Sequence, residues 1–87
     1  MKSRTTRQFW ELYHALPREI QDLADKAYEL WQQNPHHPGL QFKRVDPEKP
    51  IYSVRVGQNY RALGVRQGDT ITWFWIGKHE VYDRILR

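Results

Sequence analysis

The sequence has no cysteine among its 87 residues and a single methionine. Without cysteine the chain forms no disulfide and offers no thiolate as nucleophile or metal ligand. No apolar run approaches the roughly 20 residues that a membrane-spanning helix needs, and the first ten residues, MKSRTTRQFW, lack the apolar segment of a signal peptide. We therefore expect a soluble protein that is located in the cytoplasm.

The short motifs of several enzyme classes are also missing. The sequence has no glycine-rich phosphate loop of the P-loop type, no GxSxG turn and no HExxH pair. His36 and His37 are adjacent in a loop segment, where neighbouring side chains point apart, and no carboxylate lies at ligand spacing. The sequence thus gives no support for nucleotide hydrolysis, serine hydrolysis or zinc proteolysis. We predict no metal site and no cofactor.

The length of the chain limits the number of domains, and its charge indicates the kind of partner. A chain of 87 residues is expected to form one small domain over residues 1–87, with a modest core. Residues 1–39 carry five basic and five acidic side chains, whereas residues 40–87 carry nine basic and five acidic ones, so the net charge of +4 belongs to the second half. This asymmetry favours an anionic partner. The alternative is a basic surface that serves solubility alone.

Apolar residues recur with helical spacing in the first half of the chain. The first stripe consists of Phe9, Leu12, Tyr13 and Leu16, and the second of Ile20, Leu23, Ala24, Ala27, Leu30 and Trp31. The first helix is expected to start near Thr5 or Thr6 and to end at Pro17, and the second to end at Asn34-Pro35. The pattern predicts a hairpin of two amphipathic helices.

After the loop at 34–39 the apolar spacing changes to the alternation of β-strands. Strands are predicted within 40–45, 52–56, 60–65 and 71–76, with tight turns at 57–59 and 67–69. The last strand is apolar on both faces, which is typical of a central strand that is covered twice. We expect the helices to cover one face, and Val81, Ile85 and Leu86 or a partner protein to cover the other.

The predicted fold class is therefore α+β. A helical hairpin packs on a small antiparallel meander of about four strands, and a short helical turn follows at the C-terminus. Residues 1–6 show no clear strand pattern.

Side chains suited to RNA phosphate chemistry gather around the last strand. Metal-free cleavage of RNA needs a base for the 2′-hydroxyl, cations for the phosphate and an acid for the leaving 5′-oxygen. Imidazole suits either proton-transfer role, which points to His79. Tyr82 shares a helical face with His79 if the chain turns helical after Gly77. Arg55 and Arg61 suit the phosphate because the guanidinium is planar and always charged.

Each of these residues also has a purely structural interpretation. His79 and Tyr82 at a strand end are also consistent with ordinary surface residues. Arg55 alternates with Val54 and Val56, so it points away from the apolar face and into solvent. Arg61 shares the parity of Leu63, which points it to the apolar side unless a bulge at the strand start redirects it.

Four further residues are predicted to contact RNA. They are Lys43, Arg44, Lys78 and Trp73. The tryptophan ring either belongs to the core, as does that of Trp75, or stacks on a base.

Four short motifs occur together in a characteristic order behind the helical hairpin. They are Val54-Arg55-Val56-Gly57, Tyr60-Arg61, Ile76-Gly77-Lys78-His79 and Val81-Tyr82. Over most of its length the sequence resembles the RelE/ParE superfamily of small bacterial toxins from type II toxin–antitoxin modules. The resemblance implies a toxin that is neutralised by a cognate antitoxin. In the RelE branch, which we favour, it implies a metal-independent endoribonuclease that cleaves mRNA on the ribosome through a 2′-hydroxyl and arrests translation.

The resemblance also implies roles for single residues. Arg55 falls where the RelE branch places a basic residue on the second meander strand, and Arg61 matches the arginine of its Tyr-Arg pair. His79 stands where members carry Arg or His, and Tyr82 matches a C-terminal tyrosine. Three departures stand out. Ser53 replaces a lysine found in some members, the segment between His79 and Tyr82 is short, and the usual first strand is hard to find in residues 1–6.

Two other functions stay open. A toxin of the ParE type inhibits DNA gyrase without catalysing bond cleavage, and a third kind of member binds RNA or a partner without activity. In every case we expect an antitoxin segment to dock on the sheet or the helical hairpin, covering apolar surface around Trp73, Trp75 or the helices.

Overall fold

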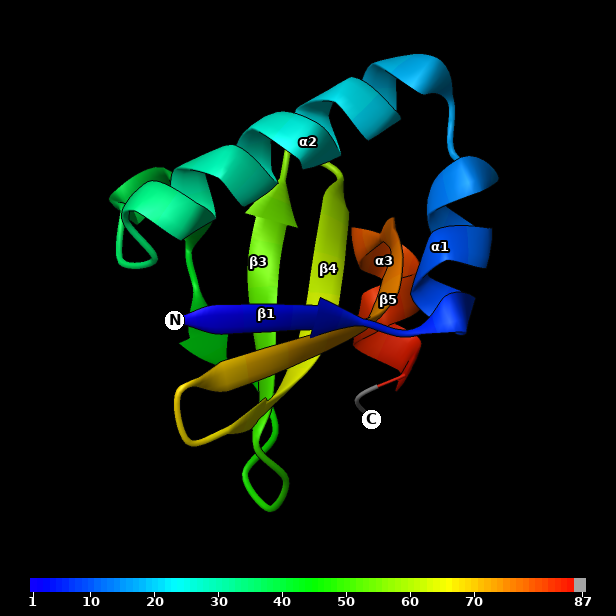
Figure 1. Cartoon of the computed structure of the whole chain (residues 1–87). Helices are drawn as coiled ribbons and strands as arrows, with labels where there is room; N and C mark the ends of the chain where they lie inside the picture. The colour runs from blue at the N-terminus through cyan, green and yellow to red at the C-terminus, as the bar shows by residue number, and fades with distance from the viewer. Residues whose placement is uncertain (86–87) are drawn as a thin grey trace.

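A computed structural model describes the backbone of residues 1–85 and the side chains of residues 1–84. The elements are β1 (Lys2–Thr5), α1 (Arg7–His14), α2 (Arg18–Gln33), a 3-10 turn (Pro38–Leu40), β2 (Lys43–Arg44), β3 (Ile51–Val56), β4 (Tyr60–Gln67), β5 (Thr70–Lys78) and α3 (His79–Ile85). Helix α1 packs on β5, while α2 packs on β3 and passes over the end of that strand (Figure 1). The α+β class and the short C-terminal helix are confirmed.

The sheet has five strands in the order β1-β5-β4-β3-β2. Strands β2 to β5 are antiparallel neighbours, as predicted, but β1 pairs in parallel with β5, with Lys2 opposite Thr70 and Thr5 opposite Trp73. The prediction of about four strands was therefore one short. Strand β1 carries no strong apolar residue, and three of its four residues are exposed. It forms through backbone pairing with β5, which leaves no alternation to recognise.

The predicted strand over 40–45 is shorter in the structure, where β2 contains only Lys43 and Arg44. The buried Leu40 closes a 3-10 turn instead, and Gln41 follows in the left-handed region with φ of 48°. A residue in that conformation interrupts an extended chain. The alternation that suggested a longer strand thus reflects one buried residue in a turn.

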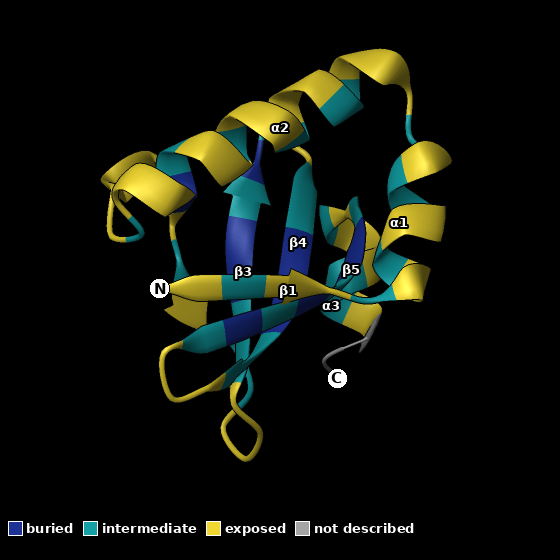
Figure 2. Ribbon diagram, viewed as in Figure 1, coloured by how far each residue is buried: buried dark blue, intermediate teal, exposed yellow. Residues whose placement is uncertain are grey.

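The helix boundaries agree with the sequence signals. The Thr6 hydroxyl accepts a hydrogen bond from the Phe9 amide and caps α1, Pro17 precedes α2, and Asn34 ends it. Trp31 of α2 is buried, and the outer faces of both helices are exposed, while the burial of the sheet is greatest in the middle of β3, β4 and β5 (Figure 2). No helix within residues 1–85 is long and apolar enough to cross a membrane.

A β-bulge in β5 puts its two tryptophans on opposite faces of the sheet. Trp75 lies opposite Leu63 and Trp73 lies opposite Gly64, so that Phe74 is an extra residue in β5 between two adjacent positions of β4. Trp73 consequently joins the core under the helices. Leu63 and Trp75, both buried, lie on the opposite face of the sheet.

Helix α3 contributes to the cover of this opposite face. It packs on β5 and β4, and Val81, one of the three residues predicted to cover the face, is 41% exposed. The other two residues assigned to this role, the side chain of Ile85 and the whole of Leu86, lie outside the described residues.

We predict that Gly64→Ala destabilises the fold by about 1–3 kcal/mol, the usual cost of overpacking. A Cβ at this position would lie 2.7 Å from Cγ2 of Ile71 and 2.9 Å from Cε3 of Trp73, both in the core. Urea denaturation measures the change. Gly39→Ala is the control, because its Cβ meets only the exposed His37 ring. Equal stability of the two variants would contradict the packing at the bulge.

Candidate functional site

Two arginines lie side by side on the sheet face opposite α1 and α2. Arg55 is paired with Arg61 across β3 and β4, and Arg61 is paired with Gly77 across β4 and β5. We call Arg55 and Arg61 the arginine row. Its face is established by alternation, since Val54, Val56 and Ala62 all belong to the core under the helices.

The predicted orientation of Arg61 is therefore confirmed in one part and wrong in the other. Arg61 shares a face with Leu63, as predicted, but this is not the face that the helices cover. The bulge lies between Leu63 and Gly64 rather than at the strand start, and no redirection of Arg61 is needed.

The Trp75 ring lies beside the arginine row. A Cβ added at Gly77 would lie 2.6 Å from Cζ2 of the Trp75 ring, so the indole occupies the space that a side chain at position 77 would take. That space is directly opposite Arg61. Arg61 is thus flanked by Arg55 on one strand and by the indole on the other.

Each guanidinium of the row is anchored to the backbone. Nε of Arg55 donates to the Gly57 carbonyl at 3.0 Å, and Nη1 of Arg61 donates to the Tyr60 carbonyl at 2.8 Å. A guanidinium has five N–H donors, so most donors of each group are left for a ligand. The pKa of Arg61 is lowered, first by burial and then by the charge of Arg55. A bound anion would offset both the burial of the Arg61 charge and its repulsion by Arg55. The row is therefore suited to binding a phosphate.

Helix α3 brings a histidine and a tyrosine to the row. It begins at His79, whose backbone amide donates to the Asn59 carbonyl at 2.7 Å and so joins α3 to the β3–β4 hairpin. The rings of His79 and Tyr82 stack with centroids 5.4 Å apart, which confirms that the spacing puts them on one face. His79 lines a cleft together with Arg61, so the stacked phenol of Tyr82 also lies near the row. If ionised, Tyr82 acts to raise the pKa of Arg61, against the lowering effects of burial and of Arg55.

Asp83 is a member of this cluster that the sequence reasoning missed. Its Oδ2 lies 3.5 Å from Nδ1 of His79, and its charge also acts to raise the pKa of Arg61. The available signal was the i, i+4 spacing from His79 to Asp83, which places the two side chains one helical turn apart. Only Tyr82, the i, i+3 partner of His79, was predicted from the sequence.

A polar cleft of about 230 Å³ opens next to the row. Its lining residues are Gln58, Asn59, Arg61, Lys78, His79 and Glu80. They come from the β3–β4 hairpin, from β4, and from the junction of β5 with α3. The cleft therefore includes Lys78, one of the residues predicted to contact RNA, together with Arg61 and His79.

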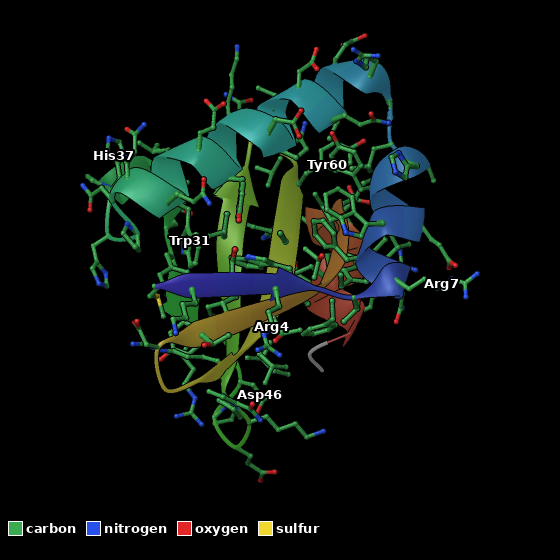
Figure 3. The ribbon with its side chains drawn as sticks, viewed as in Figure 1. Arg4, Arg7, Trp31, His37, Asp46 and Tyr60 are labelled. Atoms are coloured by element: carbon green, nitrogen blue, oxygen red, sulfur yellow. The ribbon has the colours of Figure 1, made fainter. Side chains whose placement is uncertain are left out.

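The structure separates the two basic residues of β2. Lys43 lies opposite Ser53, which lies opposite Leu63, so this exposed lysine shares the face of the arginine row. Arg44 is on the other face, and its Nε donates to the carbonyls of Asp46 and Lys49 at 3.0 and 3.2 Å. Figure 3 shows Asp46 in the loop beyond β2, at the end of the sheet away from α2. Arg44 is thus not brought to the row.

Trp73 belongs to the core, the first of its two alternatives. Its side chain is 4% exposed and packs edge-on against Trp31, with ring centroids 5.5 Å apart. Figure 3 shows Trp31 between α2 and the strands. The prediction that Trp73 contacts RNA is wrong because neither face of its ring is accessible to a base. Among the side chains of residues 1–84, no three His, Asp or Glu groups gather closely enough to hold a metal ion.

A second hollow lies on the helix-covered side of the sheet. This groove, of about 230 Å³, is lined by residues of β1, α1, α2 and the sheet, among them Ala27 of α2, Val54 of β3 and Ala62 of β4. Trp10 and Tyr28 line it and are 42% and 39% exposed. The hydroxyl of Tyr13 donates to Asp25 at 2.8 Å and links α1 to α2 beside it. We call this hollow the interhelical groove.

A model of the ParE-like toxin domain matches residues 18–84, which is most of the chain. The chain belongs to the ParE-like toxin family. The match includes the arginine row and nearly all of α3. No curated protein matches the sequence significantly.

Solved toxin structures share the fold of this family member. YafQ from E. coli BL21(DE3) superposes with a TM-score of 0.74 at 9% identity, covering 93% of this chain and 96% of YafQ. A chain of the RelB–RelE antitoxin–toxin complex from Methanococcus jannaschii gives 0.69 at 24% identity, covering 93% and 96%. The YoeB/ParE toxin from Agrobacterium tumefaciens gives 0.69 at 13% identity, covering 91% and 99%. These proteins confirm the predicted superfamily fold, and their low identities carry no residue roles.

We predict that the arginine row of this ParE-like toxin binds inorganic phosphate and that phosphate raises its melting temperature through ligand linkage. Arg61→Gln removes one of the two cations of the row and is expected to abolish the shift in melting temperature. Arg66→Gln is the matched control, because Arg66 is also on β4 and its Nε also donates to a backbone carbonyl, that of Gly68, at 3.1 Å. Differential scanning calorimetry with chloride as the reference salt measures both. If both variants lost the phosphate-induced shift in melting temperature to the same extent, the row would not be the binding site.

Proposed function

We propose that this toxin is a metal-independent, ribosome-dependent endoribonuclease that cleaves mRNA and arrests translation. One observation carries the proposal: the four residues expected from sequence to do the chemistry, Arg55, Arg61, His79 and Tyr82, cluster at one end of one sheet face. Two come from neighbouring strands and two from α3, so the folding of the chain, not sequence proximity, assembles them.

In the proposed reaction the 2′-oxygen attacks the adjacent phosphorus and the bond from phosphorus to the 5′-oxygen breaks. One proton leaves the 2′-hydroxyl and one reaches the 5′-oxygen, giving a 2′,3′-cyclic phosphate and a free 5′-hydroxyl. Arg55 and Arg61 hold the non-bridging oxygens and stabilise the charge that develops on them. His79 and Tyr82 carry the two proton transfers.

Asp83 completes this arrangement as an orienting residue. A carboxylate near Nδ1 of His79 favours the tautomer that carries its proton on that nitrogen, and this leaves Nε2 free to act on substrate. The indole of Trp75 and the hydrogen bond from Nη1 to the Tyr60 carbonyl restrict the position of the Arg61 guanidinium. The site is therefore largely positioned before RNA arrives, which is the condition for efficient electrostatic stabilisation.

We predict that primer extension on an mRNA translated in a purified bacterial system shows codon-phased cuts in the presence of the protein. His79→Ala should reduce the cleavage rate by about 10²–10⁴-fold, the usual contribution of a proton-transfer group. His36→Ala is the control, because His36 is an exposed loop residue that lies outside the arginine row and its cleft. Full cutting by His79→Ala would remove His79 from the mechanism.

A second candidate function is inhibition of DNA gyrase without catalysis, as in toxins of the ParE type. The matching family model favours it, since that model describes a ParE-like toxin domain. A basic surface serves either target, and fold alone does not decide between them. Intact mRNA, unimpaired translation and a stoichiometric block of gyrase supercoiling would establish this second function.

We also propose a cognate antitoxin as partner, docked in the interhelical groove. The groove is an open apolar hollow, and Trp73 and Trp75, once expected to mark the docking surface, are both buried. Structurally similar chains from Methanococcus jannaschii and Mycobacterium tuberculosis occur in toxin–antitoxin complexes. An apolar segment of an antitoxin would cover the floor of the groove and the exposed ring of Trp10.

We predict that Ala27→Trp fills the groove and weakens binding of the protein encoded by the adjacent gene. Ala27 is partly buried and lines the groove, whereas the neighbouring Lys26 is exposed and lies outside the lining, so Lys26→Trp is the matched control. Isothermal titration calorimetry measures binding, and circular dichroism checks that both variants are folded. Unchanged affinity in folded Ala27→Trp would place the partner elsewhere.

A further inference from the structure

The polar cleft beside the arginine row has a composition that phosphate binding does not require. Arg61 and Lys78 supply cations, but the residues that line the cleft also include Gln58 and Asn59, whose side chains are primary amides, and Glu80, whose side chain is a carboxylate. A carboxylate in a phosphate site repels the ligand. These three side chains therefore call for a different chemical partner.

The amides and the carboxylate are free to bind. Among the side chains of residues 1–84, those of Gln58, Asn59 and Glu80 take part in no hydrogen bond or ion pair, and all three residues are exposed. The two sides of the cleft are nevertheless held together, because the His79 amide donates to the Asn59 carbonyl at 2.7 Å. The hairpin that carries the amides is thus fixed against the start of α3.

We propose that this cleft is a base-recognition subsite that selects a nucleobase with an exocyclic amino group and rejects uracil. The volume of about 230 Å³ accommodates one base. Glu80 accepts a hydrogen bond from the amino group, and the amides of Gln58 and Asn59, which both donate and accept, pair with the remaining edge. The phosphate next to this base lies at Arg61 and Lys78. This inference rests on the proposed function, in that it takes RNA as the ligand of the arginine row.

The discrimination follows from the inventory of donors and acceptors. An ionised carboxylate only accepts hydrogen bonds. Cytosine presents an amino donor at C4, whereas uracil presents a carbonyl oxygen at the same position. Uracil in the cytosine position would thus set two acceptors against each other, and an unpaired polar group of this kind is costly. Cytosine and uracil are otherwise alike in size and stacking surface.

The test is an NMR titration of the ¹⁵N-labelled full chain with two uncleavable dinucleotides, the 2′-O-methyl forms of CpC and UpU. The wild type should bind CpC about fivefold more tightly, the low end of the discrimination given by a paired base edge, with shifts at the side-chain amides of Gln58 and Asn59. Glu80→Gln should bring the two affinities together, because a primary amide also donates to uracil. Glu48→Gln, in the exposed loop between β2 and β3, should leave the wild-type preference unchanged.

The outcomes separate this inference from the proposed reaction. Equal affinity of the wild type for CpC and UpU, failure to bind either, or an undiminished preference in Glu80→Gln would overturn the subsite. Codon-phased cleavage in the translation assay would stand in each of those cases. Conversely, a cytosine preference that Glu80→Gln removes would establish the subsite even if the translation assay showed no cleavage.

Discussion

The extra residue in β5, Phe74, decides which side chains reach each face of the sheet. Without it, Trp73 and Trp75 would lie on the same face of the sheet, because residues two positions apart in a regular strand share a face. With the bulge between Leu63 and Gly64, Trp73 completes the core on Trp31 and Trp75 lies beside Arg61. One local irregularity thus allows the same strand to serve both the core and the candidate site.

The sheet separates two surfaces of different chemistry. On the helix side, α1 packs on β5 and α2 on β3, and the interhelical groove between them is apolar. On the other side the arginine row faces α3, and both guanidiniums are anchored to carbonyls near the β3–β4 hairpin. An apolar partner and an anionic ligand therefore have separate places on a small molecule, and only the sheet connects them.

A feature could be predicted from the sequence where its physical cause lies among residues that are close in the chain. The helix stripes, their boundaries at Thr6 and Asn34, and the strand predicted over 52–56 depend on neighbouring residues, and the structure contains them, the strand with one residue more at its start. Strand β1 was missed because its pairing partner is distant in sequence and its side chains are mostly exposed. Asp83 was missed although its spacing from His79 was visible, since no pattern indicates which face of α3 meets the sheet.

The sequence by itself determined the family, the order of the elements that follow β1, and the residue types available for chemistry, because periodicity and short motifs are properties of the chain read locally. The tertiary structure decided which of those residues meet. Register placed Arg55 opposite Arg61, the bulge buried Trp73, and β2 turned Arg44 away from the row while Lys43 stayed on its face. Register and bulges depend on pairings between residues far apart in sequence, whose energies no local window of the chain contains.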